Sequence, residues 1–233
     1  MIERQSLRVS ATLLLTGQIL FILITQLHAD GPANDHLVVF AEYARSNTWK
    51  AVHVGQYLAM SILLAGLIAL FFALTARGTT VSWAARFGAA FAVAALALYG
   101  ALQAVDGVAL KQAVDAWARA PGAEKAARFA NAETVRWLEW GFRSYQNFAL
   151  GIALMLFAAA VLRAAPIPRP IGFLMCLSGL AYLAQGWVGE TEGFSQAHTI
   201  MIVLAFILDL AWMIWLLVVA LRMPELEPAV SPG

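Results

Sequence analysis

The stretch AVHVGQYLAMSILLAGLIALFFALT spans residues 51–75 and contains no aspartate, glutamate, lysine or arginine. A helix of about 20 mostly apolar residues crosses the hydrocarbon core of a bilayer, which is about 30 Å thick. We therefore predict that this stretch is a transmembrane helix.

The rest of the chain has the same character. Of its 233 residues, 61% are hydrophobic and 12% are charged, whereas about a quarter of the residues of a soluble domain are charged. Six segments are long and apolar enough to cross a bilayer: roughly 7–28, 51–75, 84–108, 137–162, 171–189 and 198–221. The sequence predicts an all-α polytopic membrane protein, a compact bundle of six transmembrane helices.

The first segment has an alternative interpretation. Arg4 and Arg8 precede it, and the LHA before Asp30 resembles a signal-peptide cleavage site. The apolar stretch is long for a signal peptide and is interrupted by Gln18. These features favour a retained span.

Arginines predict the orientation. Arg77, Arg86, Arg163 and Arg169 flank the two short loops near residues 76–83 and 163–170, where no acidic residue occurs. The other three loops are mixed or acidic. By the positive-inside rule, both termini are cytoplasmic.

Two segments are expected to lie outside the bilayer. Residues 109–136 have a helical composition interrupted at Pro121, which predicts that the third and fourth spans extend beyond the membrane as a hairpin. Residues 223–233 are Pro-rich, so we expect a six-helix domain over 1–222 and a disordered cytoplasmic tail over 223–233.

Small residues predict close helix packing. Gly172, Gly179 and Gly186 recur every seven residues on one face of the fifth span, and the third span is rich in alanine. Small side chains allow helix backbones to approach closely in lipid. We expect the third and fifth spans at the centre of the bundle.

Ionisable residues gather at one depth, opposite the arginine-flanked loops. His28 follows Arg8 by twenty residues and Asp106 follows Arg86 by twenty, which is about 30 Å of helix. Polar residues recur at helical spacing on several of these spans. Because polar side chains facing lipid are disfavoured, we expect an outward-facing polar pocket. Its candidate lining residues are His53, Tyr57, Gln103, Asp106, Glu139, Arg143, Gln185, Glu190 and His198.

Two charged residues in these spans have specific expected roles. Arg143 is expected to anchor the anionic group of a ligand, or to be paired with Glu139 or Asp106. Asp209 lies deep in the sixth span, where a carboxylate must be protonated, paired or directed into a cavity. The alternative is that these polar residues are only a ring at the membrane interface. The ordinary aromatic belt beside them would then consist of Trp49, Trp137, Trp140, Trp187 and Tyr145.

A metal site is one alternative for this ring. Imidazole and carboxylate groups suit zinc or iron. The candidates narrow to His53, His198 and Glu190, although no metal-ligand motif occurs within any one helix. The remaining acidic and histidine side chains of the ring are His28, Asp106, Glu139 and Glu192.

Other classes of function also remain open. A haem held by His53 and His198 would need both histidines at matched depth, as they are. An enzyme that uses a carboxylate for acid–base chemistry needs no local motif. A transporter is less favoured because internal repeats are not evident. Binding of a small molecule or lipid, or a role as an accessory subunit, requires the fewest specific sequence features and is therefore the leading interpretation. The catalytic residues, the cofactor and protein partners are left unknown.

Three segments carry a family resemblance: HVGQYLAMSILLAGLIAL from His53, LQAVDGVALK from Leu102, and YLAQGWVGETEGFSQAHT from Tyr182. In these segments the chain resembles a group of uncharacterised bacterial six-helix membrane proteins, described by a domain of unknown function. The resemblance implies a bacterial inner-membrane location and six spans, and brings no activity. The net charge of +1 gives no indication of a nucleic-acid partner.

Overall fold

The computed structural model describes residues 3–29, 31–75, 83–164 and 167–223. These residues form helices and connecting turns, with no strand in the described ranges. The elements are α1 (Arg4–Thr25), α2 (His36–Arg45), α3 (Trp49–Thr75), α4 (Trp83–Gln103), the π-helical segment η1 (Ala104–Leu110), α5 (Lys111–Arg119), α6 (Gly122–Val161), α7 (Arg169–Glu192) and α8 (Gln196–Arg222).

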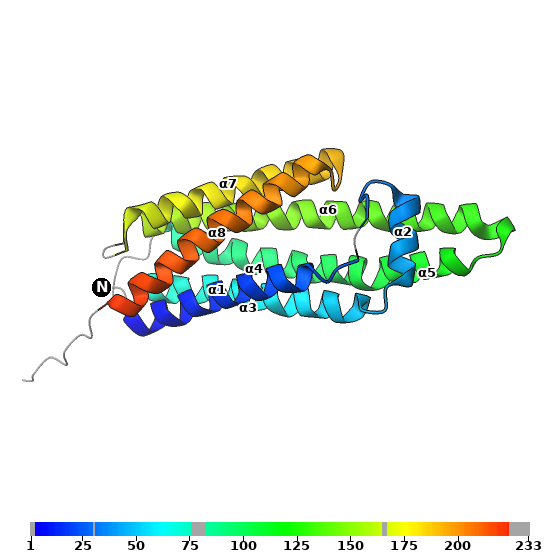
Figure 1. Cartoon of the computed structure of the whole chain (residues 1–233). Helices are drawn as coiled ribbons and strands as arrows, with labels where there is room; N and C mark the ends of the chain where they lie inside the picture. The colour runs from blue at the N-terminus through cyan, green and yellow to red at the C-terminus, as the bar shows by residue number, and fades with distance from the viewer. Residues whose placement is uncertain (1–2, 30, 76–82, 165–166, 224–233) are drawn as a thin grey trace, which may run out of the picture.

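The predicted six-span architecture is confirmed. Six helical stretches within the described ranges are long and apolar enough to cross a membrane. Five of them are α1, α3, α6, α7 and α8, and the sixth is the continuous helix α4–η1–α5 over Trp83–Arg119. The long axes run side by side in one elongated bundle, and the described N-terminal end of the chain lies at the same end of the bundle as the end of α8 (Figure 1).

The hairpin beyond the bundle is also present. α5 ends at Arg119 and α6 begins at Gly122, with Pro121 at its N-terminal boundary, as the interruption in residues 109–136 predicts. α6 is 40 residues long, about 60 Å at 1.5 Å per residue, so it extends well past a bilayer core. The orientation of the termini remains a prediction, and the tail 224–233 lies outside the described residues.

α6 is the central helix of the bundle, so the expectation of a central third span is wrong. The most apolar window of α6 is 67% buried, against 28% for the helix that contains α4. The fifth span, α7, packs its glycine face against this central helix. A Cβ at Gly179 would lie 2.7 Å from the carbonyl oxygen of Gly151, which shows how closely these backbones approach.

The short helix α2 was not predicted. Asp35 begins it by accepting a hydrogen bond from the backbone N–H of Val38 at 3.2 Å. α2 lies across α5 and α6 at the hairpin end of the bundle (Figure 1). A second apolar core holds it there, and we call this core the hairpin cluster. Its buried members are Val39, Phe40, Tyr43, Trp49, Leu110, Ala113, Val114, Trp117 and Ala132.

Candidate functional site

A polar cavity of about 490 Å³ lies next to the hairpin cluster. Its walls come from the end of α1 and the turn after it, from α2, α3, α4, η1 and α6, and from the start of α8. Five of the residues expected from the sequence line this polar cavity: Gln103, Asp106, Glu139, Arg143 and His198.

The other four expected residues lie elsewhere. His53 and Tyr57 line a second, largely apolar cavity of about 590 Å³ between α3 and the helix α4–η1–α5. Gln185 lines a third cavity of about 40 Å³, deeper in the bundle. Glu190 is solvent-exposed near the end of α7. The predicted ring is therefore divided among several environments.

Arg136 neutralises Glu139 inside the protein. Both side chains are buried, and Nη1 of Arg136 donates a hydrogen bond to the Glu139 carboxylate one turn along α6. Nη2 of Arg136 also donates to the carbonyl oxygen of Ala33 at 3.3 Å. The guanidinium lies over the rings of Tyr43 and Phe194. This ion pair therefore connects α6 to α2 and to the segment before α8.

The expected pairing of Arg143 with Glu139 or Asp106 is wrong. In the part of the chain that the structure describes, no carboxylate oxygen lies within 4.0 Å of the Arg143 guanidinium. Glu139 is taken by Arg136, and Asp106 contacts His53. Arg143 lines both the polar cavity and the deeper small one, so its positive charge faces cavity space.

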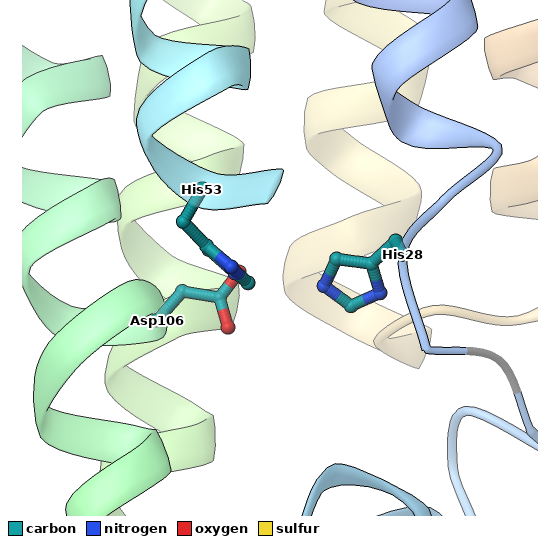
Figure 2. A group of neighbouring side chains, drawn as sticks. All are labelled: His28, His53 and Asp106. Atoms are coloured by element: carbon teal, nitrogen blue, oxygen red, sulfur yellow. The ribbon is translucent and has the colours of Figure 1, made fainter. Parts of the chain in front are cut away.

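Three side chains from three separate elements converge at the edge of the polar cavity. His28 follows α1, His53 lies in the second turn of α3, and Asp106 lies on η1; Figure 2 shows all three pointing into one space. Their potential ligand atoms all lie within 4.8 Å of one another. Of the sequence-derived metal candidates, His53 belongs to this group. His198 lies elsewhere in the polar cavity and Glu190 is exposed.

Burial sets the charge state of two titratable side chains, His28 and Tyr43, in the segment that connects α1 to α3. Burial lowers the pKa of His28 below its usual value, an effect that the negative charge of Asp106 partly opposes. The ring is therefore neutral at pH 7. Burial also raises the pKa of Tyr43, and the positive charge of Arg136 opposes part of this rise. The phenol therefore keeps its proton.

Asp209 is held in a separate polar contact within the bundle. Its carboxylate accepts hydrogen bonds from the hydroxyl of Tyr182 at 2.8 Å and from Nε1 of Trp212 at 3.0 Å. The side chain is 2% exposed. Its oxygens therefore have partners other than water, which offsets the cost of burying a carboxylate.

His53 and His198, the pair considered for haem, line different cavities. Nε2 of His53 lies 3.1 Å from Oδ2 of Asp106, and its other ring nitrogen contacts the carbonyl oxygen of Trp49. Both ring nitrogens of His53 thus already face oxygen atoms. This arrangement offers no axial pair across a shared space.

Sequence reasoning missed the residues that organise these side chains. Trp49, interpreted as part of an aromatic belt, is 2% exposed and stacks on the ring of His53 with the centroids 4.4 Å apart. The π-helical turn that carries Asp106 has no strong sequence signal beyond Gly107. Trp49 and His53 are one helical turn apart, and that spacing was the one available signal.

Comparison with known proteins gives a family and no activity. No curated protein and no solved structure matches the chain. The model of one family, described as a domain of unknown function (DUF4386), matches residues 9–220. That match covers most of the chain and reaches into all six apolar helices, as the resemblance in the sequence predicts. This membrane-spanning helical protein belongs to the DUF4386 family.

Proposed function

We propose that this protein binds an amphiphile with an anionic phosphate or carboxylate group, and that the anionic group lies against Arg143 in the polar cavity. The observation that carries the proposal is the environment of Arg143. Its guanidinium lines a cavity of about 490 Å³, and among the described residues it has no carboxylate within 4.0 Å. A cavity of this size accommodates a small ligand.

Arg143 differs from the arginine two turns before it on α6. Arg136 is neutralised by Glu139, and both groups are buried. An arginine side chain stays protonated in proteins, and an arginine charge within a membrane span is costly unless it is paired or faces water. An anionic ligand group would supply the missing partner, since the guanidinium donors match two oxygens of a phosphate or a carboxylate.

The second cavity supplies a place for an apolar tail. It opens between α3 and α4–η1–α5, where Val54, Tyr57 and Val108 are exposed. Gln103 lines both this cavity and the polar one. A ligand with an anionic head and an apolar chain would therefore fit across the two. A free small anion would use the polar cavity alone.

The same proposal includes the membrane in which the protein lies and the side to which the polar cavity opens. The resemblance to bacterial six-helix membrane proteins implies an inner-membrane location, and the arginine-flanked loops favour cytoplasmic termini, so the polar cavity would face outward. The ligand would then enter the polar cavity from the outer leaflet of the membrane or from the outer compartment.

The test uses protein purified in mild detergent. Bound lipids are extracted and measured by mass spectrometry for the wild type, Arg143→Gln and Arg163→Gln. Arg163 is the matched control because it lies just beyond the far end of α6, exposed, with Nη1 donating to the carbonyl oxygen of Ala159. Binding of inorganic phosphate is measured on the same samples by calorimetry.

We expect an anionic lipid to copurify with the wild type and Arg163→Gln, and to fall at least about tenfold in Arg143→Gln, because a charge-assisted contact is lost. Phosphate binding without copurified lipid, abolished by Arg143→Gln, would identify a free anion as the ligand. Identical lipid and phosphate binding in all three proteins would overturn the proposal.

A second class of function, a membrane-embedded enzyme that uses a metal, is favoured by one observation. His28, His53 and Asp106 place their ligand atoms within 4.8 Å of one another beside the same cavity.

A further inference from the structure

We propose that His28, His53 and Asp106 bind one divalent transition-metal ion of the zinc or iron class, with a coordination position open toward the polar cavity. The proposal goes beyond ligand binding at Arg143 and does not depend on it. It rests on the placement of three side chains from three elements, on the orientation of both imidazoles, and on unpartnered buried atoms (Figure 2).

The ligand atoms already lie close together. Nε2 of His53 and Oδ2 of Asp106 are 3.1 Å apart, and the three ligand atoms are within 4.8 Å of one another. Two ligands at about 2.1 Å from a tetrahedral ion are roughly 3.4 Å apart. His53 and Asp106 therefore need almost no movement. His28, in the turn after α1, needs only a small shift of its ring.

Backbone carbonyl groups orient both imidazoles. Nδ1 of His53 lies 2.8 Å from the carbonyl oxygen of Trp49, and Nδ1 of His28 lies 2.8 Å from the carbonyl oxygen of Ala29. Because a carbonyl oxygen only accepts, each Nδ1 carries the proton. In a neutral ring this leaves the lone pair on Nε2. A metal-bound histidine is typically held in this way by a partner on its other nitrogen.

The contact between His53 and Asp106 is close and poorly aligned. Nε2 of His53 has no hydrogen-bond partner among the described residues, although Oδ2 of Asp106 lies 3.1 Å away. Oδ1 of Asp106 is also buried and without a hydrogen-bond partner in the described structure. Buried polar atoms are normally satisfied, so such atoms require an explanation. A shared cation would satisfy both residues at once.

Helix packing and an aromatic ring hold these three side chains in position. Asp106 lies on the π-helical turn η1, and π-helical turns inside α-helices occur frequently at functional sites. η1 approaches α3 so closely that a Cβ at Gly107 would lie 2.9 Å from Cβ of His53. The ring of Trp49 packs against both histidines, with centroids 4.4 Å from His53 and 5.0 Å from His28.

The donor set indicates the class of ion. Two imidazoles and one carboxylate suit zinc and ferrous iron, and both metals use such a set with open positions for water or a substrate. His28 and Asp106 line the polar cavity, which also contains Arg143. A ligand atom in that cavity could therefore reach the open position. The chemistry available to such a site is polarisation of an oxygen or activation of a bound water.

The experiment measures metal binding by the full chain in mild detergent, without a polyhistidine tag. The protein is stripped with a chelator. It is then titrated with Zn²⁺ in competition with a chromophoric chelator, and with Fe²⁺ in the absence of oxygen. A parallel sample with Co²⁺ reports the coordination through its visible absorption bands.

We expect the wild type to bind one ion per chain. His28→Ala and Asp106→Asn should weaken the binding at least about tenfold and remove the Co²⁺ bands, because each loses a ligand. His28 is the preferred target because it lies outside the helices and is half-buried, so its replacement spares the core. Unchanged melting temperatures and gel-filtration profiles establish that the variants are folded.

The controls separate this site from the alternatives. His36→Ala removes a histidine that contacts Glu133 at 3.0 Å and lies outside the three-residue group, so it should bind metal as the wild type does. His198→Ala tests the sequence-derived candidate in the same cavity. Arg143→Gln should lose the anionic ligand and keep the metal, which distinguishes failure of this inference from failure of the proposed function.

Two results would overturn the inference. The first is a wild type that binds Zn²⁺ and Fe²⁺ no more tightly than His28→Ala, which would leave His53 and Asp106 as a simple ion pair. The second is a loss of metal in His198→Ala equal to that in His28→Ala.

Discussion

Nε1 of Trp49 donates a hydrogen bond to the carbonyl oxygen of Gly107 at 3.1 Å, which joins the first turn of α3 to the π-helical turn η1. The same tryptophan stacks on His53, and its carbonyl oxygen contacts Nδ1 of His53. Trp49 therefore holds α3, which contains His53, against η1, which contains Asp106.

Trp49→Phe tests this link. It keeps an aromatic ring and removes the N–H donor, so the carbonyl oxygen of Gly107 loses a buried partner. We expect the free energy of unfolding to fall by about 1–3 kcal/mol, measured by SDS-induced unfolding. Trp137→Phe is the control because that side chain is exposed. Equal effects from the two substitutions would contradict the structural role of the hydrogen bond.

Gly107→Ala tests the close approach of η1 and α3. The new Cβ would lie 2.9 Å from Cβ of His53, so the two helices must separate. We expect a loss of about 1–3 kcal/mol in the free energy of unfolding, together with weaker metal binding. At Gly100, earlier in the same helix, a Cβ would meet only the ring of Tyr57 at 3.6 Å. Gly100→Ala should therefore leave both measurements nearly unchanged.

The buried pair of Arg136 and Glu139 should behave differently from an exposed one. Arg136→Met leaves the Glu139 carboxylate buried without its counter-ion, and we expect a destabilisation of about 3–5 kcal/mol by SDS-induced unfolding. Adding Glu139→Gln to this variant should recover part of the loss. Arg128 pairs with Glu124 at the surface, at 3.2 Å, so Arg128→Met should cost less than about 1 kcal/mol. A small effect of Arg136→Met would show that the pair is exchangeable with solvent.

Asp209 holds two donors inside the bundle. Asp209→Leu removes the acceptor of the Tyr182 hydroxyl and of Nε1 of Trp212. We expect the thermal unfolding temperature in detergent to fall, with a loss of about 2–5 kcal/mol, because two buried donors become unsatisfied. Tyr182→Phe added to Asp209→Leu should restore part of the stability. No recovery would mean that shape, and not hydrogen bonding, dominates at this position.

The predicted orientation can be measured by fusions in a bacterial host. We expect green fluorescent protein fused after residue 233 to fluoresce, because it folds in the cytoplasm. Alkaline phosphatase inserted at Gly122, the hairpin tip, should be active because it requires the outer compartment. The opposite pattern would reverse the orientation inferred from the arginines.

The sequence predicted the fold well because hydrophobic length is a strong signal in membrane proteins. The spans, the hairpin break at Pro121 and the glycine face of Gly172, Gly179 and Gly186 all follow from local patterns. The helix α2 did not, because its ten residues are too short for a span and are stabilised by tertiary contacts of Phe40 and Tyr43.

The site was less accessible from the sequence. Counting residues from the flanking arginines placed His28 and Asp106 at one depth and His53 about one helical turn further out, because the rise per residue of a helix is constant. It could not show which ring residues share a cavity, because that depends on rotation about each helix axis. One of the two roles expected for Arg143 was pairing with Glu139 or Asp106, whereas Glu139 pairs with Arg136, which lies three residues before it. The π-helical turn changes the rotation of η1 in a way that no periodicity count includes.

The length of α6 has a consequence for how molecules reach the polar cavity. Val161, where α6 ends, follows Glu139 by 22 positions, which is about 33 Å of helix and close to the thickness of the hydrocarbon core. With Val161 at one edge of the hydrocarbon core, the polar cavity would lie at the level of the phospholipid headgroups on the other side, where water, phosphate and acyl chains meet. A hydrated cation could reach the cavity from water without entering lipid, and an amphiphile could reach it from the membrane without entering water.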